Sequence, residues 1–300
     1  MSSTKQQRTI LITGANKGLG FEVVKKLLRD ASSSSSNDLI LFGSRDVKRG
    51  EEAIRQLGSP PNVHLLQLDT SSPDSIAQAI KEIKHNYGGQ LDILINNAGI
   101  AKIGNTADVA REILATNYYG VNTLNEQISS MIRDNGRIIN VASEVGAWTL
   151  HDMSTELQNR YKSSTLTKKQ IDDLLQEYIA ALESKTAEKV GYNTKFPILS
   201  YGVSKAALIA LTHVEARQWS GAKNVLVLAV CPGYCATDIN NHGAGARPAE
   251  IGADSILHPV NAPANTLTNG EFYQDGEHMA QSYACSMALS QIADIMKDKK

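Results

Sequence analysis

The sequence is poor in cysteine, in clustered basic residues and in long apolar runs. Its three cysteines, Cys231, Cys235 and Cys285, are odd in number and lie late in the chain. They argue against a disulfide framework and favour a reducing compartment, so we expect a cytoplasmic protein. Cys231 and Cys235 have no His or Cys neighbours at zinc-ligand spacing, so we expect no metal site.

Charge and hydropathy exclude further classes of protein. The 30 Lys and Arg residues nearly balance the 31 Asp and Glu residues, and basic residues gather only in the tail Lys297, Lys299, Lys300. We therefore expect no nucleic-acid partner and no membrane partner. No apolar stretch approaches the ~18 residues of a membrane span. The first residues also lack the apolar core of a secretory signal.

Apolar sequence is plentiful, at 42% of 300 residues, and it alternates between two periods. Short apolar runs indicate strands at 9–13, 39–42, 63–68, 91–95, 137–141, 225–230 and 271–274. Amphipathic stretches between them indicate helices, including long ones at 110–133 and 200–219. This alternation predicts a single doubly wound, Rossmann-like α/β domain over residues 1–300, with about seven parallel strands.

Three segments depart from the alternation. Residues 147–197 are polar and contain a helical stripe after the capping-box pair Thr167 and Gln170, which predicts a folded helical insertion. Residues 278–300 form a carboxyl-terminal extension with helical spacing at Cys285, Leu289, Ile292 and Met296. The run Ser32–Ser36 reads as a polar linker.

A glycine-rich turn, GANKGLG, follows the first strand at once and precedes a helix. Glycines there let a backbone approach a pyrophosphate at a helix N-terminus, which favours a dinucleotide site. The alternative is a tight turn without a ligand. The candidate cofactor contacts in this turn are Gly14, Asn16, Lys17, Gly18, Leu19 and Gly20.

The ends of the next strands suggest which dinucleotide is bound. The second strand ends at Ser44 and Arg45, without the acidic residue that often holds the ribose of NAD. Arg45, joined by Lys17, can pair with a 2′-phosphate, which favours NADP(H); the alternative is a solvated surface arginine. Asp69 ends the third strand and is either an adenine contact or a helix cap. Asn97, after the fourth strand, has a half-structural character, because its amide can shape the turn.

The stretch LSYGVSKAA places Tyr201 four residues before Lys205, on one face of a helix. Lowering a phenol pKa from ~10 to about 7 requires roughly 4 kcal/mol. One lysine at about 4 Å supplies an energy of that order at an effective dielectric of ~20. The pair can therefore carry proton chemistry near neutral pH.

Taken in chain order, these motifs resemble the short-chain dehydrogenase/reductase family from about residue 8 to about 275. The resemblance is carried by TGANKGLG, NNAG at 96–99, Asn117, Ser143, Tyr201, Lys205 and Pro232-Gly233. The long gap from Ser143 to Tyr201, with SRD at 44–46 and CPGYCATD at 231–238, is similar to the monomeric NADPH-dependent carbonyl reductases. The polyserine run, Tyr234 where relatives often carry tryptophan, and the carboxyl-terminal extension depart from that pattern.

The resemblance implies a role for each matching residue. Tyr201 would give a proton to a carbonyl oxygen that Ser143 hydrogen-bonds, and Lys205 would lower the phenol pKa and hold the cofactor ribose. Asn117 would keep a water in the proton relay, or would merely bend its helix. The implied cofactor contacts are Ala98, Gly99, Pro232, Gly233 and Thr237, and the implied pocket residues are Trp148 and Tyr234.

The resemblance also implies the activity. We expect NADPH to reduce a ketone, aldehyde or quinone carbonyl to the alcohol. Alternatives are an oxidoreductase dedicated to one secondary metabolite and a protein that senses NADPH without turnover. The complete set of proton-transfer groups argues against the sensor. In the similar reductases the insertion covers the helix that other members use to form tetramers, which implies a monomer.

Overall fold

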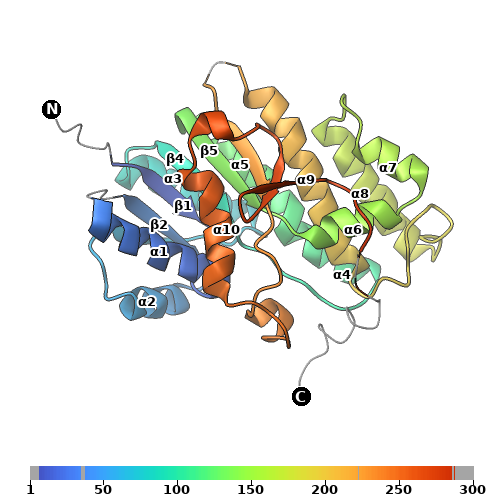
Figure 1. Cartoon of the computed structure of the whole chain (residues 1–300), viewed down its shortest axis with the longest axis horizontal. Coiled ribbons are helices and arrows are strands. Elements are labelled where there is room, and N and C mark those ends of the chain that lie inside the picture. The colour runs from blue at the N-terminus through green and yellow to red at the C-terminus, as the bar shows by residue number, and fades with distance from the viewer. Residues whose placement is uncertain (1–6, 35–37, 222, 286, 288–300) are drawn as a thin grey trace.

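The structure, a computed structural model, describes residues 7–34, 38–221, 223–285 and 287. Within these residues eight strands form one sheet in the order β3-β2-β1-β4-β5-β6-β7-β8, parallel except for β8 (Figure 1). The strands are β1 (Thr9–Ile12), β2 (Leu39–Ser44), β3 (Val63–Gln67), β4 (Leu91–Asn96), β5 (Ile132–Val141), β6 (Leu226–Val230), β7 (Phe272–Gln274) and β8 (Glu277–Met279). The predicted doubly wound α/β fold is confirmed, and its strand order reverses between β1 and β4.

Helices cover both faces of the sheet. They are α1 (Gly18–Ser34), α2 (Val47–Gln56), α3 (Pro73–Asn86), α4 (Ala107–Leu114), α5 (Gly120–Ile128), α6 (Glu144–Asp152), α7 (Thr155–Tyr161), α8 (Lys168–Glu183), α9 (Leu199–Trp219) and α10 (Ala249–Asn261), with short turns η1 (Ala115–Tyr119), η2 (Asp238–Asn240) and η3 (Ala264–Thr266). Ile10 and Ile12 pack with α1, α2 and α10, whereas Leu11 packs with α3 and α5 on the other face. All three side chains are fully buried, as strands covered on both faces require.

The long helix expected at 110–133 is wrong in its length. The chain forms α4, then the π-helical turn η1, then α5, and it enters β5 at Ile132. The helix widens at η1 because Asn117 turns inward and bonds the backbone of Ile100. It ends early because Ile132 already pairs with Leu91 of the neighbouring strand.

The serine run and the carboxyl-terminal extension also differ from expectation. Residues 32–34 continue α1 rather than forming a linker, and 35–37 lie outside the described residues. The extension begins as a strand, because β8 turns back antiparallel to β7 at Glu277–Met279. Cys285 lies in a segment without regular structure, and Leu289, Ile292 and Met296 lie outside the described residues.

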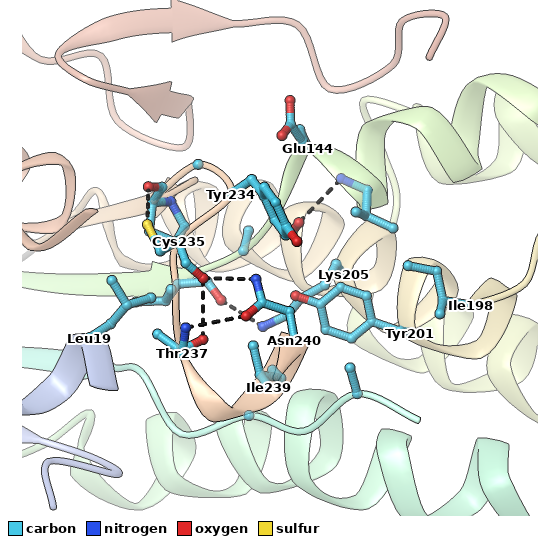
Figure 2. Close-up of a pocket in the computed structure, with 18 of the residues that line it drawn as sticks. Leu19, Glu144, Ile198, Tyr201, Lys205, Tyr234, Cys235, Thr237, Ile239 and Asn240 are labelled. Carbon is cyan, nitrogen blue, oxygen red and sulfur yellow. Dashed lines mark hydrogen bonds between the residues drawn. The ribbon is translucent and has the colours of Figure 1, made fainter. Parts of the chain in front are cut away.

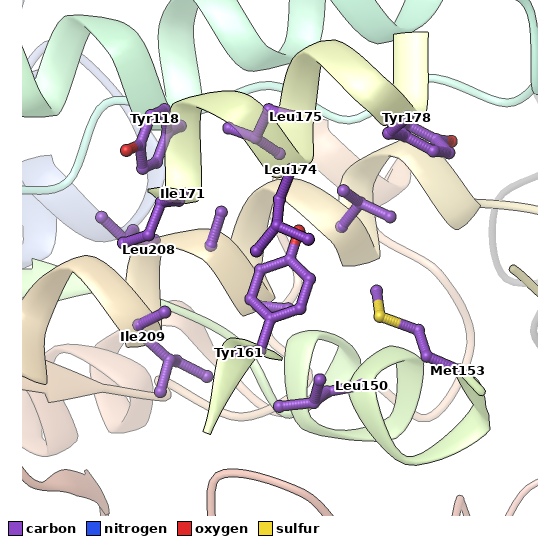
Figure 3. Packing of buried hydrophobic residues seen from close by; sticks show 14 of the residues in the cluster. Tyr118, Leu150, Met153, Tyr161, Ile171, Leu174, Leu175, Tyr178, Leu208 and Ile209 are labelled. Carbon is purple, nitrogen blue, oxygen red and sulfur yellow. The ribbon is translucent and has the colours of Figure 1, made fainter. Parts of the chain in front are cut away.

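The segment between Ser143 and Tyr201 carries three helices, α6, α7 and α8. Helix α6 begins at Glu144, before the predicted start of the insertion, because the Ser143 hydroxyl caps it. Helix α8 begins with the predicted capping box of Thr167 and Gln170. Figure 3 shows Ile171 and other apolar residues of α8 packed against residues of α9 in one buried cluster.

An ion pair joins α8 to α9 beneath this apolar layer. Lys168 Nζ lies 2.8 Å from Glu215 Oε1, and the Glu215 side chain is fully buried. The Asn125 amide also donates to Glu215 Oε2 at 2.8 Å. Burial raises the pKa of Glu215 to about 7, against the lowering effect of Lys168. The insertion is therefore held to α9 by both apolar packing and a buried charge pair.

None of the helices in the described part of the chain combines the length and apolar character that a bilayer crossing requires. In the same residues, no group of three or more His, Cys, Asp or Glu side chains is placed to hold a metal ion.

Candidate active site

The glycine-rich turn crosses the carboxyl end of β1 and opens into α1. Gly14 and Gly18 have φ values of +63° and +55°, a region that other residues rarely adopt. A Cβ on Gly20 would lie 2.5 Å from the Gly14 carbonyl oxygen and 2.6 Å from Asn97 Nδ2. The turn thus leaves bare backbone at the N-terminus of α1, which fits a pyrophosphate.

Thr13 and Asn97 tie this turn to the end of β4. Thr13 Oγ1 accepts from the backbone of Asn97 at 3.0 Å and of Ala98 at 2.9 Å. Asn97 Nδ2 donates to the carbonyl oxygens of Thr13 and Gly14. Asn97 therefore shapes the turn, as its half-structural character suggested. Sequence reasoning missed Thr13, although a hydroxyl residue directly before the glycine turn was the available signal.

The residues expected near the adenosine phosphate are separated from one another. Arg45 is exposed and has no hydrogen bond or ion pair to any described residue. Lys17 is also exposed, but its ammonium lies 2.7 Å from Asp238. Ser44 is buried and its hydroxyl donates to the Asp46 carbonyl, so its side chain serves the β2–α2 turn. Asp69 accepts from the backbone and hydroxyl of Ser71 and so shapes its own loop.

The predicted catalytic residues meet at the carboxyl ends of β5 and β6 (Figure 2). Ser143 precedes α6, and its Oγ accepts from Val145 N at 3.2 Å. Tyr201 and Lys205 project from α9, with Lys205 Nζ 5.7 Å from the centroid of the Tyr201 ring. Lys205 Nζ also donates to the Val141 carbonyl at 2.7 Å. All three side chains line one cavity of about 160 Å³.

The protonation states differ from the sequence-based expectation. Burial raises the pKa of Tyr201 to about 12, although the Ser143 side chain, which hydrogen-bonds the phenol, lowers it. Burial lowers the pKa of Lys205 to about 8. The expectation that Lys205 brings the phenol pKa toward 7 is therefore wrong for the structure described here, because burial is the largest influence on the phenol and Lys205 is not among the groups that shift it. At neutral pH Tyr201 carries its proton and Lys205 is mostly charged.

Asn117 lies in η1 and is fully buried. Its amide donates to the Ile100 carbonyl and to Ser204 Oγ, while its carbonyl oxygen accepts from Ile100 N at 2.9 Å. The side chain therefore fixes the loop after β4 against α9 at Ser204, the residue directly before Lys205. π-Helical turns of this kind are frequent at functional sites.

Helices α6 and α9 approach each other through glycines. A Cβ on Gly146 would lie 2.7 Å from the backbone nitrogen of Ala206, and one on Gly202 would lie 1.8 Å from Thr149 Oγ1. These contacts leave no room for larger residues. They bring Ser143, at the start of α6, beside Tyr201 and Lys205.

The loop after β6 forms one side of the cavity. Pro232, Gly233 and Thr237 line it together with Leu19, Asn97 and Gly99 from the other loops. Arg247 holds this loop in place by donating to the Pro232 carbonyl and pairing with Asp275. Cys231 is buried, and burial raises the pKa of its thiol to about 12, so it is a structural residue.

The outer wall of the cavity contains Trp148 and Tyr234, which were the predicted pocket residues. It also contains Glu144, Ile198 and Met287, which sequence reasoning missed. Met287 reaches the wall because the segment after β8 runs across it, where Tyr283 and Met287 pack against the apolar cluster that contains Trp148. No spacing in the sequence signals that contact, because it joins residues far apart in the chain.

The fold and this set of side chains are those of a dinucleotide-dependent oxidoreductase. The chain belongs to the short-chain dehydrogenase family, whose profile matches residues 8–164. Carbonyl reductase (NADPH) 3 of Rattus norvegicus is 34% identical over 279 residues, which are 89% of this chain and 96% of that protein.

Two solved structures are similar in fold. Salutaridine reductase of Papaver somniferum has a TM-score of 0.78 at 28% identity, covering 89% of this chain and 99% of its own. Menthone neomenthol reductase of Mentha piperita has a TM-score of 0.70 at 27% identity, covering 89% and 98%.

Proposed function

We propose that this enzyme reduces a ketone, aldehyde or quinone carbonyl to the alcohol with NADPH, and that Tyr201 is the proton donor. The observation that carries the proposal is the meeting of Tyr201, Ser143 and Lys205 on one cavity that the cofactor loops also line. The name of the rat relative, a carbonyl reductase with NADPH, supports the same activity.

The residues present fit NADPH. The bare backbone of the glycine turn suits the pyrophosphate, and the exposed Arg45 guanidinium suits a 2′-phosphate. Thr237 and Gly233 line the cavity, where they can contact the nicotinamide carboxamide. NADPH supplies the hydride when bound.

The protein supplies the proton and holds the carbonyl oxygen. Ser143 Oγ and the Tyr201 hydroxyl donate to that oxygen, where negative charge develops as hydride reaches the carbon. Tyr201 then transfers its proton to the oxygen, which completes the alcohol. A phenol whose pKa is about 12 is fully protonated at neutral pH, which is the state that reduction requires. Lys205 holds the ribose hydroxyls with its ammonium.

Replacing Tyr201 tests this role directly. Tyr201→Phe should lose several orders of magnitude in turnover and keep its affinity for NADPH, because only the proton is removed. NADPH oxidation is followed with quinones, isatin-like diketones and aryl ketones, and NADPH binding by fluorescence. Tyr119→Phe, which removes a half-buried phenol outside the cavity, is the matched control. Near-normal turnover by Tyr201→Phe would refute the assignment.

We also infer that the enzyme is a monomer of the cytoplasm. The insertion covers α9 with α8, which supports the first inference. All three cysteines are free, which supports the second.

A further inference from the structure

The cavity wall carries one carboxylate, Glu144, that the proposed reaction does not use. Glu144 follows Ser143 directly, is the first residue of α6 and lines the cavity while half-buried. In the view of Figure 2, Glu144 lies beyond Tyr234 as seen from Tyr201. In that view the Tyr234 side chain lies between the carboxylate and the proton donor.

This carboxylate has no partner within the described part of the chain, where it forms neither a hydrogen bond nor an ion pair through its side chain. Arg247 is the cation whose charge lowers the pKa of Glu144. Its guanidinium already pairs with both oxygens of Asp275 at 2.8 and 2.9 Å and donates to the Pro232 carbonyl. Burial raises the pKa of Glu144 more than Arg247 lowers it. A half-buried carboxylate on the wall of this cavity, with no partner in the described part of the protein, is free to pair with a cationic group of a ligand.

The helix dipole does not account for this placement. An acidic residue in the first turn of α6 is favourable, but that effect stabilises the charged form and is available to a fully exposed side chain. Here the side chain lies against the cavity, and desolvation is the largest influence on its pKa. Its negative charge also raises the pKa of Tyr201 and of Tyr283, which lies in the segment after β8.

The rest of the outer wall suits a bulky cation. Ile198 and Met287 offer apolar contact, while Trp148 and Tyr234 add aromatic rings. Aromatic faces attract quaternary and protonated amines, and a nearby carboxylate supplies the opposite charge. A neutral ketone would fill the same space but would leave Glu144 buried beside it without a partner.

We propose that Glu144 is a specificity-determining residue that selects carbonyl substrates bearing a protonated amine or quaternary ammonium group. The carbonyl oxygen lies at Tyr201 and Ser143, and the cation lies toward Glu144 and Trp148. This inference rests on the proposed carbonyl reduction, and it narrows the substrate to a class.

A matched pair of ketones tests the selection. The probes are meta-(trimethylammonio)acetophenone and meta-tert-butylacetophenone, which share a shape and differ by one permanent charge. The measured quantity is the ratio of their kcat/KM values with NADPH. Glu144→Gln should lower this ratio about tenfold, the size of effect typical of one partly buried charge interaction. Glu144→Asp keeps the charge and should retain most of the ratio.

Glu156→Gln is the control, because Glu156 is an exposed acid in the first turn of α7, outside the cavity. Its ratio should equal that of the unaltered enzyme. An unchanged ratio in Glu144→Gln overturns the inference and leaves the proposed function intact. If the unaltered enzyme turns over neither of these ketones but does reduce the quinones or diketones named above, the inference is overturned and the proposed function stands; no turnover with any of these carbonyls overturns both.

A measurement on the unaltered enzyme covers the case in which Glu144→Gln does not fold. The ratio of the two kcat/KM values should fall as salt rises to about 1 M, because the screening length shrinks to about 3 Å and the advantage of the charged ketone is lost. A ratio that does not change with salt overturns the inference, because any ion pair at the open end of this cavity is screened.

Discussion

Arg45 is the residue on which the choice between NADPH and NADH depends, if its exposed guanidinium holds the 2′-phosphate. Arg45→Ala should weaken NADPH binding by about 1.5–3 kcal/mol, the range for hydrogen bonds to charged groups, and leave NADH binding unchanged. Affinities for both cofactors are measured by fluorescence titration. Arg49→Ala is the control, because Arg49 is an exposed arginine in the first turn of α2. Equal losses for the two cofactors would contradict the role.

Lys205 should set the alkaline limit of cofactor binding. The pKa of Lys205 is lowered to about 8, so its ammonium loses its proton above that pH, whereas Tyr201, with a pKa of about 12, keeps its own. NADPH affinity should therefore fall as pH rises through about 8. Titrations from about pH 6 to about pH 10 measure this, and Tyr201→Phe should show the same fall. A flat profile over this range would exclude Lys205 as the titrating group.

Single residues with a characteristic spacing could be read from the sequence, whereas residues assembled by folding could not. Tyr201 and Lys205 share a helix, so their proximity follows from four-residue spacing. Glu144 and Met287 reach the cavity only through tertiary packing, and neither carries a motif. The pKa of Tyr201 was mispredicted because sequence spacing contains the lysine charge but not the burial that opposes it.

At the scale of elements, the close contact of α6 with α9 fixes the geometry of catalysis. A Cβ on Gly146 would meet the backbone of Lys205 and Ala206 at 2.7 Å. Gly146→Ala should therefore push the two helices apart, lower the free energy of unfolding by roughly 1–3 kcal/mol and reduce kcat. Urea unfolding and NADPH oxidation measure the two effects.

Gly221→Ala is the matched control for this substitution. A Cβ there meets nothing within 4 Å, and the residue has no positive φ. Its unfolding midpoint and its kcat should stay close to those of the unaltered enzyme. Equal behaviour of the two variants would show that α6 can shift at no cost.

Elements with a strong period were predictable, and their ends were not. The stripe of α3 and its cap at Ser72 and Pro73 are read directly from the sequence. The interruption of the helix near Asn117 was not predicted, because the apolar period continues through η1. Only the tertiary hydrogen bond between Asn117 and Ile100 bends the helix there. β8 was not predicted because it is only three residues long and two of them are charged or ionisable, so no apolar run marks it as a strand.

At the scale of the whole molecule, the covered face of α9 bears on assembly. With α8 packed on that helix and Lys168 paired to the buried Glu215, the surface available for a second copy is reduced. Light scattering across a range of concentrations should therefore give a mass near 32.4 kDa. A mass two or four times larger, constant on dilution, would contradict the inferred monomer.

The glycine contact between α6 and α9 also divides the enzyme into parts that can change independently. Ser143, Tyr201 and Lys205 belong to one rigid pair of helices, whereas Tyr234 and Met287 come from segments that cross the pocket without helix or strand structure. Exchanging those crossing segments between homologues should retarget the enzyme to new molecules while the hydride and proton steps stay intact. The helix pair can therefore be kept constant in engineering, while the crossing segments are exchanged to change the substrate.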